Sequence, residues 1–244
     1  MSYRAIMFLT ALIVAVVAYL IGSISFSIIF THAYTRKDIR KFGSGNAGLT
    51  NVLRSVGPEA GVLTFIGDFG KGVLCTLVGL LAFKYLTIIN GSYLIDPMYG
   101  RYIGGIFGLL GHIFPAYYGF KGGKGVLISA GILVMIDWRI FLIVVPGIFL
   151  FTFLTTRIVS LASIVAAVSY PIVTFLMFSE ADKYIDQINA FFIDQRLFET
   201  LFGVLFALIV VITHIPNIKR LLKGQEKRMK FKRSQKIEAE DANV

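Results

Sequence analysis

The stretch Gly111–Val126, GHIFPAYYGFKGGKGV, combines glycines and lysines in a way that suits phosphate binding. Glycine adopts φ values that other residues resist, and turns of this kind point backbone N–H groups into anion-binding concavities. We therefore expect the amides of Gly122 and Gly123 to face a phosphate. The alternative interpretation is a flexible loop whose lysines only set the membrane topology. The candidate ligands of this stretch are His112, Lys121, Gly122, Gly123, Lys124 and Gly125.

Two further polar stretches lie far from the first in the sequence. Gly43–Arg54 reads GSGNAGLTNVLR, and its candidates are Gly43, Ser44, Gly45, Asn46, Thr50, Asn51 and Arg54. His214–Glu226 reads HIPNIKRLLKGQE, and its candidates are His214, Asn217 and Glu226. Each stretch also has an ordinary interpretation as a helix cap, a turn or a snorkelling base. Because all three are expected on one membrane face, a shared site is favoured.

Asp68 and Lys71 are charged residues within an apolar run, three residues apart and so on one face of a helix. Charges in hydrocarbon are costly and usually face a cavity or a partner. Two interpretations carry equal weight: an ion pair that holds helices together, or a part of the site.

The elements that must position these residues are membrane helices. The chain has 244 residues, of which 56% are hydrophobic and only 16% charged, whereas soluble domains carry about 25% charge. Its apolar runs are long enough to cross roughly 30 Å of hydrocarbon as helices. We expect an all-α polytopic membrane protein with a single domain over residues 1–244. The predicted spans are Ile6–Phe30, Glu59–Leu86, Tyr102–Phe114, Gly125–Ile136, Trp138–Leu154, Ile158–Phe178 and Glu199–Ile215. The third and fourth are short and glycine-rich, so five full spans is the fallback count.

Lysine and arginine are unevenly divided between the two sets of loops. Most lie in segments 31–58 and 115–124, at Arg157, and in the basic tail from about residue 217. The positive-inside rule places these segments in the cytoplasm and the N-terminus outside. The net charge of +10 then suits anionic headgroups, and no nucleic-acid partner is expected. The outer loop Ser179–Arg196 is interpreted as a solvated lid without chemistry.

Several other chemistries lack their motifs. The sequence has three histidines and no H-E-x-x-H, so no metal is expected. It has no G-x-S-x-G elbow, and no histidine is followed by aspartate five residues later. Tyr118 and Gly125 stand where a Walker A loop needs its first glycine and its Ser/Thr. Cys75 lies in the middle of an apolar run and is interpreted as a small buried side chain.

The chain closely resembles the bacterial acyl-phosphate:glycerol-3-phosphate acyltransferases over nearly its whole length. Four stretches carry the resemblance, in the family's order. The family pattern G-S-G-N-P-G-A-T-N-x-x-R matches from Gly43 to Arg54, with Ala47 and Leu49 replacing proline and alanine. D-x-x-K-G matches Asp68, Lys71 and Gly72, and G-H-x-F-P…F-K-G-G-K-G-V matches Gly111–Val126. H-x-x-N-I-x-R…G-x-E matches from His214 to Glu226.

The resemblance implies acyl transfer from an acyl phosphate to the 1-hydroxyl of sn-glycerol 3-phosphate, giving lysophosphatidic acid and phosphate without a cofactor. A mixed anhydride is already activated, so the protein must mainly position two anions and stabilise developing charge. We expect Arg54 to clamp a phosphate and Ser44 to donate a hydrogen bond to the acyl phosphate, with Lys124, His214 and Asn217 also catalytic. Asp68 and Glu226 are expected to support the structure.

Two questions stay open at this level. The proton of the glycerol hydroxyl goes either to His214 as general base or to a substrate phosphate, and we favour the phosphate. The alternative function is a transporter or channel for an organic phosphate. Against it, the chain has no repeated halves, and its polar residues gather at one face. We expect a monomer in the bacterial inner membrane, with the site facing the cytoplasm.

Overall fold

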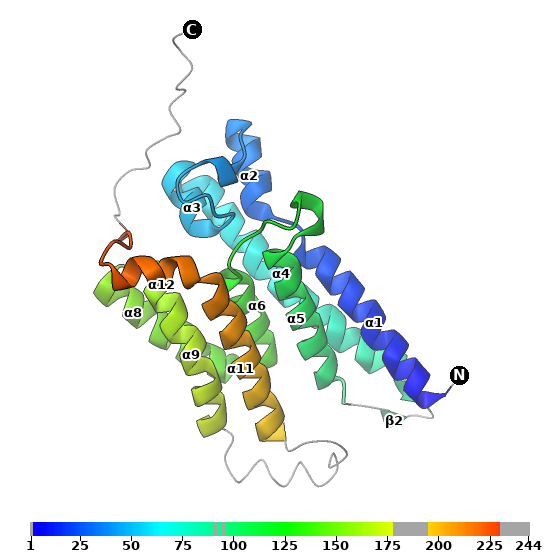
Figure 1. The fold of residues 1–244 in the computed structure, drawn as a ribbon. Helices are drawn as coiled ribbons and strands as arrows, with labels where there is room; N and C mark the ends of the chain where they lie inside the picture. The colour runs from blue at the N-terminus through cyan, green and yellow to red at the C-terminus, as the bar shows by residue number, and fades with distance from the viewer. Residues whose placement is uncertain (1, 90–91, 94–95, 178–194, 230–244) are drawn as a thin grey trace. The chain divides into compact units, whose positions relative to one another are not determined.

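The computed structural model describes residues 2–89, 92–93, 96–177 and 195–229, and helices make up most of them (Figure 1). These residues form two compact units, one ending at Ile132 and one beginning at Leu133. The all-α class predicted from the sequence is confirmed. The prediction of a single domain stays a prediction, and each unit is described by itself below.

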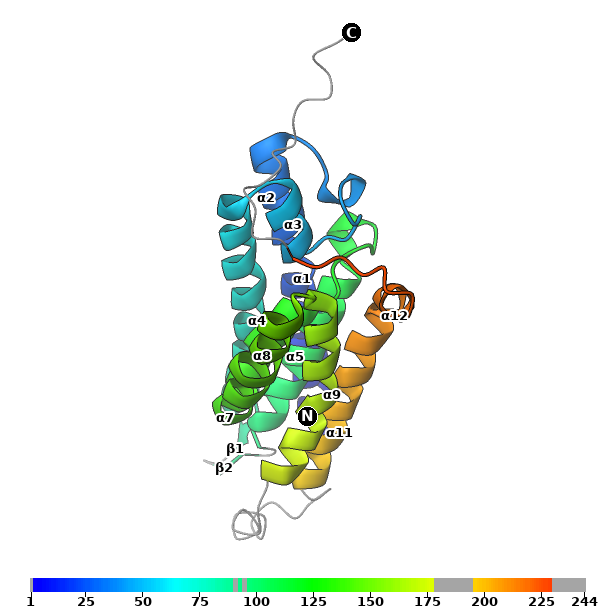
Figure 2. The same cartoon turned by 90° about the vertical axis from the view of Figure 1, so that its left-hand side faces the viewer.

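The first unit is built around three long helices. Its elements are α1 (Tyr3–Gly22), α2 (Phe26–Thr35), η1 (Ile39–Lys41), α3 (Leu49–Ser55), α4 (Pro58–Leu86), β1 (Ile88–Ile89), β2 (Ser92–Tyr93), α5 (Met98–Ile113), η2 (Ala116–Tyr118) and most of α6 (Val126–Ile136). The two strands form a small antiparallel hairpin at the end of α4 opposite α3 (Figure 2). Helix α4 starts with Pro58 at its first turn, where the missing amide removes no helical bond.

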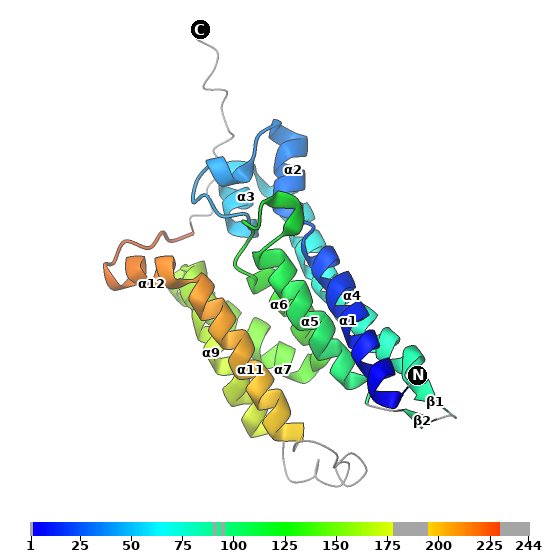
Figure 3. The ribbon, with the colours of Figure 1, turned by 45° about the vertical axis from the view of Figure 1, so that its right-hand side comes forward.

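Glycines let α1, α4 and α5 pack backbone to backbone. A Cβ added to Gly79 of α4 would overlap the carbonyl of Gly100 in α5, and one added to Gly22 of α1 would overlap that of Gly108. Figure 3 shows the three helices side by side. Small residues are the usual means of close approach between membrane helices. The glycines of the predicted span 102–114 therefore serve packing, and α5 is one continuous helix.

The second unit consists of α7 (Trp138–Leu142), η3 (Ile143–Phe149), α8 (Leu150–Thr156), α9 (Val159–Met177), α11 (Gln195–Thr213) and α12 (Ile215–Leu222). Helix η3 is a wide π-helical segment that contains Pro146. Proline lacks the amide that an α-helical turn needs, and a local change of helix type accommodates it. Helices α9 and α11 pack side by side, with Gly203 against Pro171.

Four described helical runs are long and apolar enough to cross a membrane: 3–35, 58–86, 138–156 and 159–177. A fifth is 197–222, if the helices on either side of its 64° bend count as one span. The predicted span Ile6–Phe30 lies within the run 3–35, but it is not one continuous helix, because the chain breaks at residues 23–25 between α1 and α2. The count of seven spans stays a prediction. The outer loop up to residue 194 and the tail beyond 229 lie outside the described residues.

Candidate functional site

The polar stretch Gly43–Arg54 folds around the side chain of Asn51. Its Nδ2 donates to the carbonyls of Ile39 (3.2 Å), Phe42 (2.9 Å) and Asn46 (3.1 Å), and its Oδ1 accepts from the amide of Ser44 (3.1 Å). Asn51 is 4% exposed. Its polar atoms thus serve the loop itself, which favours a scaffolding role over the direct phosphate binding expected for it.

The tight turn before α3 presents Ser44 at the surface. Gly43 and Gly45 on either side have φ of +59° and +71°, a region that favours glycine. Both glycines and Ser44 are exposed, whereas Asn46, Thr50 and Arg54 are half-buried. A Cβ on Gly43 would also overlap Oδ1 of Asn51.

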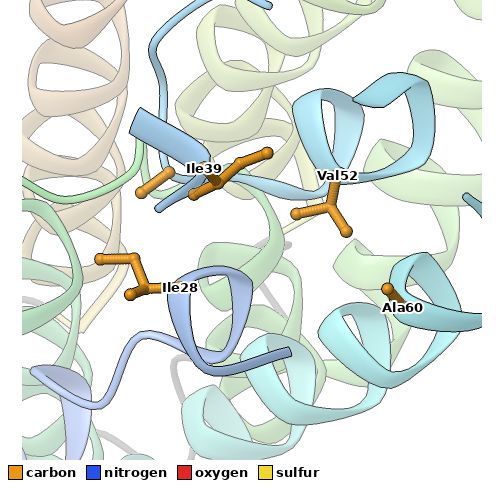
Figure 4. Close-up of a cluster of buried hydrophobic side chains, with 5 residues drawn as sticks. Ile28, Ile39, Val52 and Ala60 are labelled. Atoms are coloured by element: carbon orange, nitrogen blue, oxygen red, sulfur yellow. The ribbon is translucent and has the colours of Figure 1, made fainter. Parts of the chain in front are cut away.

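An apolar cluster beneath this loop fixes it to the helices. Ile28 of α2, Ile39 of η1, Val52 of α3 and Ala60 of α4 pack together with Ala47 (Figure 4). Tyr118 of the glycine-rich stretch packs against the same cluster. Burial of these side chains stabilises the arrangement by roughly 0.8 kcal/mol per methylene. Two predicted site stretches are therefore joined by a common core.

The glycine-rich stretch is folded back on the end of α5. The amide of Gly122 donates to the carbonyl of Ile113 and that of Gly123 to the carbonyl of His112, both at 3.1 Å. The prediction that these two amides face a phosphate is wrong, because they complete the C-terminal turn of the helix instead. Cβ atoms at Gly122 and Gly123 would overlap the carbonyl and the ring of His112, respectively. Glycine is needed here for close packing.

The rest of the glycine-rich loop turns through left-handed backbone. Gly119, Phe120 and Gly125 have φ of +66°, +59° and +86°. Lys121 is exposed and Lys124 half-buried, whereas Gly125 and His112 are buried. His112 thus contacts the loop through both its carbonyl and its ring, which favours a role in orienting the loop over the ligand role predicted for it.

Two residues outside the predicted set tie the segment just before Gly43 to the glycine-rich stretch. The guanidinium of Arg40 holds the carboxylate of Asp38 at 2.7–3.1 Å and also donates from Nη1 to the carbonyls of Tyr118 (2.7 Å) and Lys121 (3.3 Å). The hydrogen bond from Arg40 holds the pKa of Asp38 below its ordinary value, against the opposing effect of burial. An aspartate two residues before an arginine, next to the GSG turn, is the signal that points to this pair.

Asp68 and Lys71 form an ion pair of 2.9 Å, and each side chain is 2% exposed. Nζ of Lys71 also donates to the carbonyl of Ile24, in the break between α1 and α2. Nδ1 of His112 lies 3.7 Å from Oδ1 of Asp68. Lys71 thus donates to a backbone carbonyl in the break, where the helical hydrogen-bond pattern is interrupted. The interpretation as an ion pair that holds helices together is therefore favoured for both residues.

In the second unit, His214 lies at the bend between α11 and α12 and is 2% exposed. Its Nδ1 is 2.7 Å from the carbonyl of Val210. Because a carbonyl only accepts, Nδ1 carries the proton and the lone pair of the neutral ring is on Nε2. The turn persists across Pro216, since the amides of Asn217 and Ile218 both donate to the carbonyl of His214 at 2.9 Å.

Glu226 gathers three donors from the second unit. Oε1 accepts from Asn217 Nδ2 (2.7 Å) and Ser160 Oγ (2.8 Å), and Oε2 accepts from Arg220 Nε (2.6 Å). Burial raises the pKa of Glu226, but these hydrogen bonds outweigh it and the pKa lies below the ordinary value. Gly224, at φ +66°, turns the chain back after α12 so that Glu226 reaches its partners. Sequence reasoning missed Ser160 as a partner, since nothing in its local sequence points there.

The comparisons with known proteins agree along the length of the chain. Residues 12–224 match a family model described as glycerol-3-phosphate acyltransferase. Glycerol-3-phosphate acyltransferases from Chlorobium luteolum and Chlorobium chlorochromatii are each 38% identical, covering 93% and 91% of this chain and 99% and 98% of their own lengths. The crystal structure of PlsY (YgiH), an integral membrane glycerol 3-phosphate acyltransferase in its glycerol 3-phosphate form, is 32% identical. It covers 90% of this chain and 96% of its own, with a TM-score of 0.71. The lysophosphatidic acid form of PlsY matches with a TM-score of 0.67.

Proposed function

Because the chain belongs to the glycerol-3-phosphate acyltransferase family, we propose that it acylates sn-glycerol 3-phosphate with an acyl phosphate as the donor. The observation that carries the acceptor is the match to PlsY in a glycerol 3-phosphate form and a lysophosphatidic acid form. The family assignment favours this activity over the alternative of an organic phosphate transporter.

The choice of donor rests on the chemistry of the site residues. Both proposed substrates carry phosphate, and the candidate cations Arg54, Lys121 and Lys124 lie in the two stretches that share a core in the first unit. Arginine binds phosphate bidentately and lysine as a point charge. An acyl phosphate brings its own good leaving group. Binding and orientation of two anions then supply most of the catalysis.

In the proposed reaction, the 1-hydroxyl oxygen attacks the carbonyl carbon of the acyl phosphate, and the bond from that carbon to the phosphate oxygen breaks. Ser44, exposed on its glycine turn, donates a hydrogen bond to the acyl phosphate, and Arg54 clamps a phosphate. The products are lysophosphatidic acid and inorganic phosphate. The hydroxyl proton leaves with the phosphate in the mechanism that we favour.

His214 and Asn217 serve the same reaction by holding glycerol 3-phosphate. The Nε2 lone pair of His214 suits a hydrogen bond from a substrate hydroxyl, because Nδ1 is committed to Val210. Glu226 fixes the amide of Asn217. The same lone pair also suits a general base, and the pH dependence of kcat in His214→Gln decides between the two roles.

The chain is a multi-pass bacterial membrane protein. We propose the inner membrane as its location, an N-terminus outside the cell, a cytoplasmic site and a monomeric state. The lysines and arginines concentrated in segments 31–58 and 115–124 support this orientation. The fatty chain of the donor can then stay in the bilayer while its headgroup reaches the polar loops.

The test is acyl transfer by the purified protein in detergent, with sn-glycerol 3-phosphate and either an acyl phosphate or acyl-coenzyme A. We expect lysophosphatidic acid and phosphate from the acyl phosphate alone. Equal rates with acyl-coenzyme A would contradict the proposed donor, and no lysophosphatidic acid from either would contradict the activity.

A further inference from the structure

The side chain of Arg40 links η1, which directly precedes the loop Gly43–Arg54, to the glycine-rich loop. One edge of its guanidinium is occupied by Asp38, and Nη1 reaches the carbonyls of Tyr118 and Lys121. Asp38 is itself fixed, because its Oδ1 accepts from the backbone amide of Arg40 at 2.9 Å. Asp38 therefore fixes the orientation of the Arg40 guanidinium that bonds the glycine-rich loop.

The glycine-rich loop needs such a tie. Gly119 and Phe120 have left-handed φ, and glycines lose the most conformational freedom on folding. The amides of Gly122 and Gly123 tie the inner side of the loop to α5. Arg40 holds the preceding part of the loop, through the carbonyls of Tyr118 and Lys121 that flank Gly119 and Phe120.

We propose that Arg40 is a positioning residue for the anion site, with Asp38 holding it in place. Arg40 fixes the backbone from which Lys121 and Lys124 extend, and it sets that backbone relative to the loop of Ser44 and Arg54. The kinetic part of this inference rests on the proposed function, whereas the structural part does not. A planar, forked donor is required, since a lysine at position 40 cannot bond a carboxylate and two carbonyls in the same geometry.

The chain contains a matched control in its second unit. Asp137 and Arg139 have the same spacing and the same local geometry: Asp137 accepts from the amide (2.8 Å), Nε (3.2 Å) and Nη2 (2.7 Å) of Arg139. Arg139→Gln thus removes an equivalent local fork without touching residues 118–121.

The first measurement is hydrogen exchange of the amides in residues 118–125, on purified protein in detergent. We expect Gly122 and Gly123 to exchange about tenfold faster in Arg40→Gln, which corresponds to about 1.4 kcal/mol of lost local stability. Arg139→Gln should leave their exchange unchanged. This measurement needs no substrate, so its outcome is independent of the activity.

The second measurement is a comparison of KM and kcat for both phosphate-bearing substrates. We expect Arg40→Gln to raise KM for at least one substrate about tenfold while kcat falls less, because ligands are displaced and the chemistry is kept. Arg40→Lys should show the same pattern, and Arg139→Gln the wild-type values. If Arg40→Gln does not fold, Asp38→Asn loosens the fork more gently and should shift exchange and KM in the same directions.

Three outcomes would overturn the inference: wild-type exchange and KM in folded Arg40→Gln, equal changes in Arg139→Gln, or full rescue by Arg40→Lys. Wild-type protein that forms no lysophosphatidic acid, with faster exchange in Arg40→Gln, would instead contradict the proposed function and leave the tie intact.

Discussion

Replacing Glu226 probes the network that holds Asn217. Glu226→Gln keeps Oε1, so Asn217 and Ser160 retain an acceptor. It replaces Oε2 by an NH₂ group that faces the Nε–H donor of Arg220. Glu226→Ala removes the acceptor from all three donors. The two substitutions therefore separate one charged bond from the whole network.

The expected losses in the free energy of unfolding depend on how exposed each partner of Glu226 is. A hydrogen bond to a charged group contributes about 1.5–3 kcal/mol. The Arg220 side chain is 44% exposed, so solvent screening places Glu226→Gln near the lower end, at about 1.5 kcal/mol. Glu226→Ala also leaves the buried donors of Asn217 and Ser160 without their partner, and we expect about 3–5 kcal/mol.

The assay is reversible unfolding in detergent across a range of pH. The pKa of folded Glu226 lies below its ordinary value. Its stabilisation is therefore complete above the ordinary value and is lost as the pH falls through the folded value. The gap between wild type and Glu226→Gln should thus close on acidification. Equal losses below about 0.5 kcal/mol for both variants, or a gap that widens in acid, would refute this account of the network.

Three further predictions concern the proposed site. Arg54→Lys keeps the charge but loses the planar fork, so acyl transfer should fall severely, and near-normal activity would make Arg54 a membrane-side anchor. Gly122→Ala would place a Cβ against the carbonyl of His112, so melting temperature should fall and KM rise. Gly70→Ala in α4, where an added Cβ meets no atom within 4 Å and the backbone is helical, should keep a near-wild-type melting temperature and KM. If His214 only binds glycerol 3-phosphate, His214→Gln should reach the wild-type kcat at saturating substrate from pH 6 to 9. A roughly hundredfold loss of kcat, together with loss of the wild-type pH dependence near neutrality, would instead show general-base catalysis.

Much of the fold could be predicted because the bilayer restricts the choices. Backbone groups in hydrocarbon must pair within a segment, so long apolar runs indicate helices. The predicted span Glu59–Leu86 agrees with α4 to within a residue. The break at residues 23–25 could not be predicted, because a distant ion pair, Asp68–Lys71, stabilises it.

The sequence by itself determined which polar residue types are present and in what order, and that was sufficient for the family and the acceptor. Only the tertiary structure decided what each residue contacts. The amides of Gly122 and Gly123 complete a helix end, Asn51 folds its own loop, and Arg40 ties η1 to the glycine-rich loop. The physical reason is that a donor bonds whichever acceptor the packed chain brings near it. Sequence spacing specifies that neighbour only within a turn or two of a helix.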